Sequence, residues 1–218
     1  PLKWIINTGR DWESLRDELI RREAQLFPDW VVLIEREIHR VHQQTLEELP
    51  EWNQGCSSAH SELFAKAQST LDKIRDSLSP YKTLQMVRDV GSPLGLIAEN
   101  NAQADEVDTI IAPLVSEIPE MQVVRNDIYF RFAHVNYHKG SCLQQICKEE
   151  GVGPELCFTA GDNINDLAML ERKYAHFLAC PSNSLPEVKA KVRDQGGFVA
   201  DQPADLGILQ ALKHFFGD

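Results

Sequence analysis

The fold of this protein is decided by residues 158–170, which read FTAGDNINDLAML. A short apolar run stops at Gly161, releases Asp162, and then re-enters a helix-like stretch. An apolar strand that runs into Gly-Asp places the carboxyl group at the carboxyl end of the strand, which is the edge where open α/β sheets bind ligands. Residues 158–170 therefore predict an α/β fold with a ligand site at Asp162.

Asp166 follows Asp162 by four residues, so one helical turn would bring both side chains into one pocket. Two carboxylates at that distance repel each other unless a cation or a lysine lies between them. A simpler interpretation is that Asp162 or Asn163 caps the following helix, as Asp and Asn often do. Residues 158–170 alone leave both interpretations open.

The composition narrows the class of partner. The chain has 218 residues, of which 43% are hydrophobic, and this is enough for one large domain or two small ones with real cores. Its formal net charge is -11, and no run of Lys or Arg offers a groove for a nucleic-acid backbone. The sequence therefore predicts no nucleic-acid partner. The negative net charge still allows a phosphorylated small molecule to be bound by a few local positive groups.

The cysteines and the apolar stretches predict a compartment. The five cysteines form an odd set without CxxC spacing and lie in apolar surroundings, which predicts reduced thiols in a cytoplasmic protein. There is no stretch of 18 apolar residues and no signal peptide, so we expect a soluble protein without a membrane partner. Nothing in the sequence predicts an oligomeric state.

The first residues contain a second turn of the strand-to-helix type. Residues 2–7 form an apolar, strand-like run, and residues 11–22 carry apolar side chains near helical spacing. Thr8 and Gly9 lie between the two, where a helix start offers backbone N–H groups to an anion. An ordinary Thr-Gly turn explains the same residues.

The middle of the chain predicts a separate module. From about Ile34 the pattern changes to an order of helix, strand, strand, helix, strand, strand, typical of a small α+β unit with antiparallel hairpins. The expected elements are a helix at 57–78, strands at 83–90 and 94–98, a helix at 102–118, and strands at 121–124 and 127–132.

After Tyr137 the pattern returns to alternating helices and strands, which predicts a parallel sheet. A helix ends at Glu150, the strand 156–159 leads into the Gly161-Asp162 turn, and a helix is expected from there to about Arg172. The predicted fold is thus a Rossmann-like parallel α/β core, residues 1–33 and 137–218, interrupted by an α+β insertion at 34–136.

Three separated motifs together resemble one protein family. In chain order they are NTGR at 7–10, HKG at 138–140 opening a helix, and GDNIND at 161–166. This set resembles the haloacid dehalogenase (HAD) superfamily of phosphatases, and the insertion resembles the cap of its subclass IIB, the Cof-like sugar-phosphate phosphatases. PSNS at 181–184, before Val188 and Lys189, is similar to the loop and helix that follow the acidic motif. The resemblance covers nearly the whole chain.

The resemblance implies a Mg²⁺-dependent phosphomonoesterase that acts on a small phosphorylated metabolite. The substrate class that it implies is the sugar phosphates. Asp162 and Asp166 would form the metal site, with Asp162 as a hard oxygen ligand and Asp166 orienting a metal-bound water or holding Lys139. Lys139 would neutralise the phosphoryl oxygens as a compact point charge. A lysine that merely starts a helix in solvent is the simpler alternative.

The remaining implied contacts are hydrogen bonds to the same phosphoryl group. Thr8 would donate its hydroxyl and Gly9 its backbone N–H, and both would stabilise the charge that develops during transfer. Asn165 would reach the phosphate or the substrate from the first helical turn. The cap would close over the site and choose the leaving group.

One part of the family pattern is missing. The family nucleophile is the first Asp of a DxD pattern on the strand before the Thr motif, and no DxD occurs in these 218 residues. In the family that strand is central, flanked by the strands that carry the Thr motif and the acidic motif. We therefore expect a portion of a longer phosphatase whose nucleophile lies upstream, and little activity from these residues alone.

Two other functions remain open. A non-catalytic sugar-phosphate-binding or regulatory protein would keep Thr8, Lys139 and Asp162 and lack the nucleophile. A nucleotide-binding α/β protein ranks last, because neither GxGxxG nor GxxxxGK[ST] is present to cradle a polyphosphate.

Overall fold

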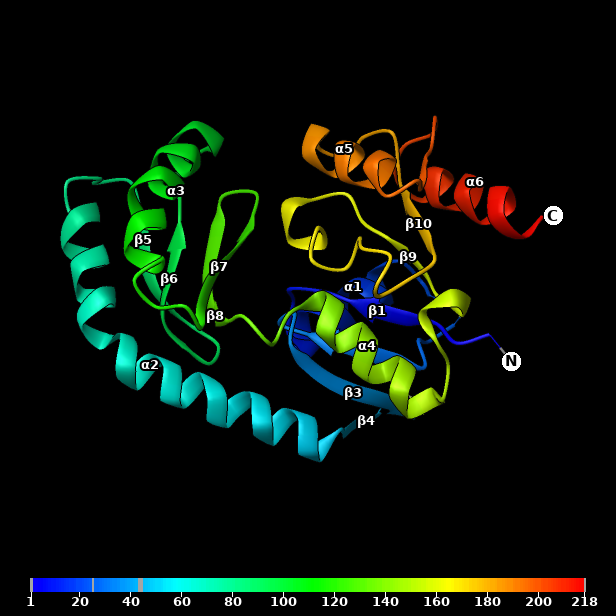
Figure 1. Ribbon diagram of the computed structural model, residues 1–218, viewed down its shortest axis with the longest axis horizontal. Coiled ribbons are helices and arrows are strands. Elements are labelled where there is room, and N and C mark those ends of the chain that lie inside the picture. The colour runs from blue at the N-terminus through cyan, green and yellow to red at the C-terminus, as the bar shows by residue number, and fades with distance from the viewer. Residues whose placement is uncertain (1, 25, 43–44, 218) are drawn as a thin grey trace.

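The computed structural model describes residues 2–24, 26–42 and 45–217. Its first sheet has the order β1-β2-β3-β4. Strand β1 (Ile5–Asn7) runs parallel to β2 (Trp30–Leu33), with helix α1 (Trp12–Arg21) between them in the chain. Strands β3 (Glu37–His42) and β4 (Thr45–Glu48) continue the sheet as antiparallel neighbours. Because the two strands are parallel, the turn that follows β1 lies at the carboxyl-terminal ends of both strands (Figure 1).

The second sheet consists of three parallel strands in the order β11-β10-β9. These are β9 (Phe158–Ala160), β10 (Phe177–Cys180) and β11 (Phe198–Val199), with helix α5 (Pro186–Asp194) between β10 and β11 and helix α6 (Ala204–Phe216) after them. The apolar side of α5 is buried against Cys180 and Leu170. Parallel strands separated by helices confirm the predicted α/β core.

Helix α4 (Lys139–Glu150) joins the two sheets. Cys142 and Ile146 pack with Trp30 and Val32 of the first sheet. The same helix turns Leu143 and Cys147 toward a cluster that includes Leu178 of the second sheet and is contacted by Ile5 of β1. Within the described residues β1 and β9 do not hydrogen-bond to each other, and each is an edge strand of its own sheet.

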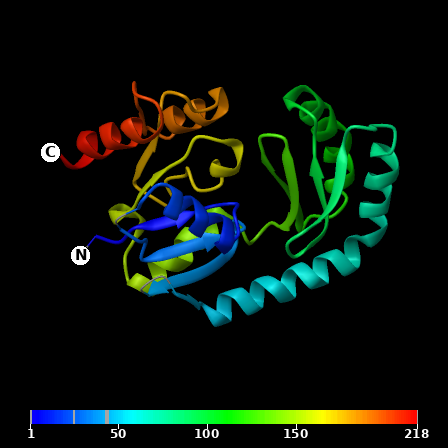
Figure 2. The same cartoon turned by 180° about the vertical axis from the view of Figure 1, so that it is seen from behind.

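The insertion has the predicted element order. Helices α2 (Pro50–Leu78) and α3 lie on one face of a four-stranded antiparallel sheet with the strand order β5-β6-β8-β7 (Figure 2). Apolar side chains of both helices pack with those of the sheet in one cluster. The remaining bounds are β5 (Gln85–Asp89), β6 (Ser92–Ile97), α3 (Asn101–Val115), β7 (Met121–Asn126) and β8 (Tyr129–His134). Leu71, Ile74 and Phe132 are fully buried there, so the insertion has a core of its own.

The expected boundary of the insertion at residue 34 does not coincide with the change of sheet. Strand β3 pairs with β2 of the first sheet and β4 pairs with β3, and neither pairs with β5 to β8. We therefore propose that the insertion begins at Pro50, where α2 starts, and that residues 34–49 belong to the core. The sequence pattern missed the two strands because they are short and mostly polar.

The helix predicted from Asn163 to about Arg172 is wrong. The structure has only the short 3₁₀ turn η2 (Ile164–Asp166) there, followed by further turns. The carboxyl group of Asp166 folds back onto the backbone that precedes it, and the carbonyl of Ala168 lies where any side chain on Gly140 of α4 would have to go. These tertiary contacts hold the segment in turns that helical periodicity could not reveal.

All five cysteines are buried and none forms a disulfide. No helix among the described residues has the length and apolarity needed to cross a membrane.

Candidate active site

The three sequence motifs meet at the carboxyl-terminal ends of β1 and β9. Thr8 and Gly9 directly follow β1, and Asp162 lies just beyond β9. Lys139 is the first residue of α4, which packs against both sheets. Asn7 of β1 donates its side-chain N–H to the Lys139 carbonyl at 2.9 Å, so the turn after β1 is tied to the start of α4.

Lys139 and Asp166 form a buried ion pair. The Lys139 Nζ lies 2.7 Å from Asp166 Oδ1, and the two side chains are 6% and 8% exposed. The simpler alternative of a solvated helix-start lysine is therefore wrong. A buried ammonium is stable only with such a partner, so Asp166 holds the positive charge of Lys139 in this site.

The second oxygen of Asp166 orders the acidic loop. Oδ2 accepts the backbone N–H groups of Asp162 at 2.8 Å and of Asn163 at 3.1 Å. Gly161 is required for this arrangement, because a Cβ there would lie 2.3 Å from the Asp166 Cβ. The capping interpretation is partly confirmed as well, since the Asn163 side chain accepts the Ile164 N–H at 2.7 Å.

Asp162 has a different environment from Asp166. The residue is exposed, while its carboxyl group lies partly against protein atoms. This partial burial, together with the negative charge of Asp166, raises the pKa of Asp162, and the positive charge of Lys139 opposes the shift. A carboxyl group that is accessible and destabilised as an anion is well suited to bind a cation.

The two aspartates differ in how well they could serve as ligands of Mg²⁺. Mg²⁺ takes oxygen ligands, usually one or two carboxylates with waters and substrate phosphate. Asp162 fits such a position, whereas both oxygens of Asp166 already accept hydrogen bonds from Lys139 and the loop backbone. In the described part of the chain, no group of three or more His, Cys, Asp or Glu side chains converges on one point. These residues therefore fit one carboxylate ligand of a Mg²⁺ site.

The turn after β1 is held by the neighbouring hairpin. The Thr8 carbonyl accepts the Glu35 N–H at 2.9 Å, and the Arg10 carbonyl accepts the Ile34 N–H at 3.0 Å. The Thr8 hydroxyl oxygen accepts the Arg10 N–H at 3.2 Å, so its own proton stays available for donation. Thr8 and Gly9 thus lie between strand β1 and helix α1, as predicted, in a turn that is hydrogen-bonded to the neighbouring hairpin.

Asn165 has a partner that the sequence did not predict. Its Nδ2 donates to Glu35 Oε1 at 2.7 Å, and both residues are buried. Glu35 is 130 positions away in the chain, in the turn between β2 and β3. No motif marks Glu35, and only its unusual place among apolar residues could have drawn attention to it.

The insertion contacts the same edge. Arg131 of β8 forms an ion pair with Asp89, with its Nε 2.5 Å from Oδ2, and its Nη1 lies 3.4 Å from the Gly9 carbonyl. In the opposite direction, Arg36 of the core donates Nη2 to the Val90 carbonyl of the insertion at 2.7 Å. These two arginines connect the insertion to the turns around Thr8 and Glu35.

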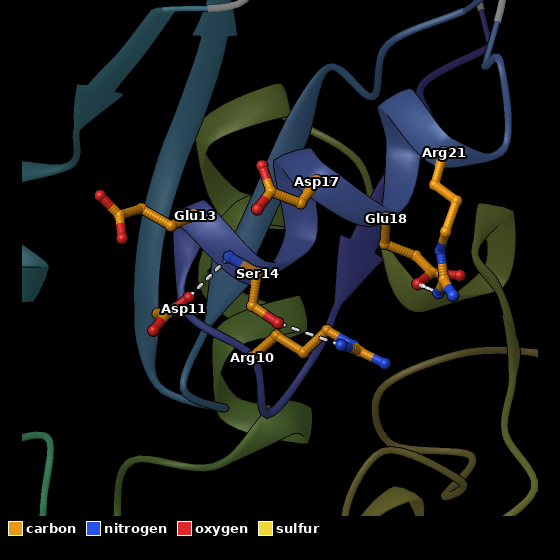
Figure 3. Close-up of a pocket in the computed structure, with 7 residues that line it drawn as sticks. All are labelled: Arg10, Asp11, Glu13, Ser14, Asp17, Glu18 and Arg21. Atoms are coloured by element: carbon orange, nitrogen blue, oxygen red, sulfur yellow. Dashed lines mark hydrogen bonds and ion pairs between the residues drawn. The ribbon is translucent and has the colours of Figure 1, made fainter.

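Two hollows lie outside this cluster. The first, of about 500 Å³, lies along α1 and the turn before it and is lined by four acidic side chains, two arginines and Ser14 (Figure 3). The second, of about 450 Å³, lies between α2 and the β5–β6 turn and is lined by Arg36, Arg88 and Asp89 among others. Neither contains Thr8, Lys139 or Asp162.

Several solved structures share this fold. A sucrose-phosphatase from Synechocystis, solved with sucrose and phosphate, matches 97% of this chain and 83% of its own with a TM-score of 0.73 and 18% identity. A phosphatase of the haloalkanoate superfamily from Bacteroides thetaiotaomicron matches 100% of this chain and 83% of its own, with a TM-score of 0.62 and 16% identity. A sugar phosphatase of HAD subclass IIB matches 98% and 85%, with a TM-score of 0.57 and 16% identity.

Comparison with curated protein sequences gives no significant match. The family assignment comes from residues 30–212, which match the haloacid dehalogenase-like hydrolase family over most of the chain. That range contains Lys139 and the acidic loop at 161–166 described above. The chain therefore belongs to the haloacid dehalogenase-like hydrolase family.

Proposed function

We propose that this protein is a Mg²⁺-dependent phosphomonoesterase of a small phosphorylated metabolite, with a sugar phosphate as the class of substrate. The observation that carries this proposal is the buried Lys139–Asp166 pair beside the partly buried carboxyl group of Asp162. Phosphoryl transfer requires mainly positioning and charge stabilisation, and this cluster supplies both. The sugar is suggested by the named activities of two proteins of the same fold, a sucrose-phosphatase and a sugar phosphatase.

In this proposal each residue acts on the phosphoryl group or holds another that does. Lys139 neutralises phosphoryl oxygens, and Asp166 acts as its positioning residue and not as a metal ligand. Asp162 supplies a carboxylate to Mg²⁺, which when bound neutralises charge on the phosphoryl group. Thr8 donates its hydroxyl to the same group and Gly9 its N–H.

The nucleophile is proposed to lie on a strand outside the described residues. The 218 residues contain no DxD pattern, and β1 and β9 are end strands of two sheets that share helix α4. Unpaired strand edges are a template for a further strand, and a strand paired with β1 and β9 would join the two sheets. Its aspartate would end beside Thr8 and Asp162 and form the aspartyl-phosphate intermediate.

The test is phosphatase activity with sugar phosphates and an aryl phosphate. In the protein at its full natural length we expect Mg²⁺-dependent turnover, and we expect Asp162→Asn to reduce kcat/KM by more than about tenfold, which corresponds to ~1.4 kcal/mol of transition-state stabilisation. Asp194→Asn, on the exposed side of α5, is the matched control. An Asp162→Asn enzyme as active as the control would remove the metal-ligand role.

A non-catalytic protein that binds sugar phosphates is the second candidate. The absence of a DxD pattern from the 218 residues favours it, because Thr8, Lys139 and Asp162 would still bind an anion and a cation. Binding of a sugar phosphate without turnover at full natural length would select this function. Formation of an acid-stable, hydroxylamine-sensitive phosphoenzyme would exclude it.

A further inference from the structure

The three-residue turn between β2 and β3 reaches into the candidate site. It comprises residues 34–36, and Glu35 at its centre is only 5% exposed. A glutamate with so little exposure needs polar partners within the protein. The partners of Glu35 come from three separate parts of the chain.

The backbone of Glu35 is fixed on two sides. Its N–H donates to the Thr8 carbonyl at 2.9 Å, and the Cys142 thiol of α4 donates to its carbonyl, with the sulfur 3.7 Å from the oxygen. The turn is further closed by the Arg36 N–H, which donates to the Leu33 carbonyl at 3.0 Å. The position of Glu35 is therefore set by the turn after β1 and by the helix that begins at Lys139.

The turn has a backbone conformation that its residues do not favour. Ile34 has φ +44° and Glu35 has φ +67°, both in the left-handed region. Hairpin turns of this kind usually carry Asn or Gly, and a β-branched residue such as isoleucine is a marked outlier there. Strain of this type persists where the surroundings over-determine it, and it is concentrated at functional sites.

The side chain of Glu35 connects the two site loops. Its Oε1 accepts the Asn165 Nδ2–H at 2.7 Å. The same oxygen would lie 3.1 Å from a Cβ on Gly9, so any side chain at position 9 would crowd the carboxyl group. The glycine of the Thr8-Gly9 motif therefore leaves space for Glu35, and through Glu35 the turn after β1 reaches the loop after β9.

We propose that Glu35 is a positioning residue for the phosphoryl site, a role that rests on the proposed function above. A carboxamide has two N–H donors. Glu35 takes one donor of Asn165 and thereby orients the other toward the space beside Gly9, where a phosphoryl oxygen binds. Glu35 acts through Asn165 and does not itself contact the phosphate.

Charge and hydrogen bonding by Glu35 have opposite effects on an anion. The ionised carboxyl group repels a phosphate dianion, whereas its oxygen holds the Asn165 donor in place. Glu35→Gln keeps an acceptor oxygen and removes the charge. Glu35→Gly and Glu35→Asn remove the reach to Asn165, and both residues tolerate the left-handed backbone of position 35.

The experiment is a titration of the ¹⁵N-labelled protein with inorganic phosphate, followed by NMR at the Asn165 side-chain NH₂ and the Gly9 N–H. We expect Glu35→Gly and Glu35→Asn to shift the Asn165 resonances before any phosphate is added and to weaken phosphate binding about tenfold. We expect Glu35→Gln to bind phosphate at least as tightly as the wild type. Glu48→Gln, an exposed glutamate of the same sheet, is the control.

Each alternative result has a distinct meaning. If the Gly and Asn variants bind phosphate as tightly as the wild type, or leave the Asn165 resonances in place, the positioning role of Glu35 is overturned and the proposed function stands. If the wild type itself fails to bind phosphate, the proposed function is overturned, and the role of Glu35 with it. The two substitutions at position 35 keep the test valid should one of them not fold.

Discussion

The ammonium of Lys139 lies 2.7 Å from Oδ1 of Asp166, and both side chains are almost completely buried. Lys139 begins the helix that packs on both sheets, while Asp166 ends the loop that follows β9. The pair therefore fixes the relative positions of two motifs that are 27 residues apart in the chain. In the proposed function, the Lys139 ammonium of this pair neutralises phosphoryl oxygens of the substrate.

Breaking this pair should destabilise the protein strongly. Removal of one partner leaves the other charge buried and unpaired, so we expect Lys139→Met or Asp166→Asn each to lower the free energy of unfolding by about 3 kcal/mol or more. The double variant should lose less than the sum of the two single variants. Urea unfolding of the four proteins measures the coupling.

The exposed pair Lys73–Glu117 is the matched control for that cycle. Its N–O distance is 2.9 Å, close to that of the buried pair, but its side chains are 53% and 46% exposed. We expect Lys73→Met to cost less than about 1 kcal/mol, because solvent screens the interaction. Equal losses for the buried and exposed pairs would show that burial does not decide the energy of Lys139–Asp166.

Mg²⁺ should protect the folded protein through Asp162. A ligand that binds only the native state stabilises it by mass action, about 2.7 kcal/mol at one hundred times the dissociation constant. We expect Mg²⁺ to raise the Tm of the wild type and of the Asp194→Asn control, and chelation by EDTA to reverse the rise. In Asp162→Asn the rise should vanish, and a Tm that still follows Mg²⁺ in this variant would place the metal elsewhere.

His60 should make stability depend on pH. Its Nδ1 donates to the Cys56 carbonyl at 2.7 Å and its Nε2 accepts the His134 N–H at 3.1 Å, so the neutral ring is fully hydrogen-bonded. Burial, followed by the positive charge of Arg36, lowers the pKa of His60 from 6.5 to about 4. The unfolded state therefore binds a proton first as the pH falls.

The stabilisation from His60 is complete above pH 6.5 and is lost as the pH falls toward about 4. We expect a loss on the order of 3 kcal/mol over that window, measured by urea unfolding at several pH values. His60→Gln should flatten the slope, whereas His42→Gln, at a 56% exposed side chain, should leave it unchanged. A slope that survives in His60→Gln would assign it to another group.

Arg131 should hold the insertion against the core through its contact to the Gly9 carbonyl. Arg131→Met removes the contact to the Gly9 carbonyl, so we expect the insertion to open and the radius of gyration from small-angle X-ray scattering to increase. Arg125→Met is the control, because Arg125 pairs with Asp105 inside the insertion at 2.7 Å. An unchanged scattering profile in Arg131→Met would mean that the other contacts, such as Arg36 to Val90, suffice for closure.

Local chemistry explains what the sequence predicted well. Thr8, Lys139 and the 161–166 loop each lie where a strand ends or a helix begins, and such positions are marked by Gly, Asp and apolar spacing within a few residues. The element order of the insertion was equally readable, because its helices and strands bury one apolar side each. The family assignment was predicted from the same motifs and is confirmed.

The sequence by itself thus determined the fold class and the residues of the three motifs, while the tertiary structure alone decided how they are joined. Glu35 was invisible in the sequence because its partners Thr8, Cys142 and Asn165 lie in other elements. Residues 163–172 were misjudged as a helix for the same reason, since Asp166 pairs with Lys139, which lies 27 residues away. Hydrogen bonds between distant segments leave no periodic trace in the chain, so only the folded arrangement reveals them.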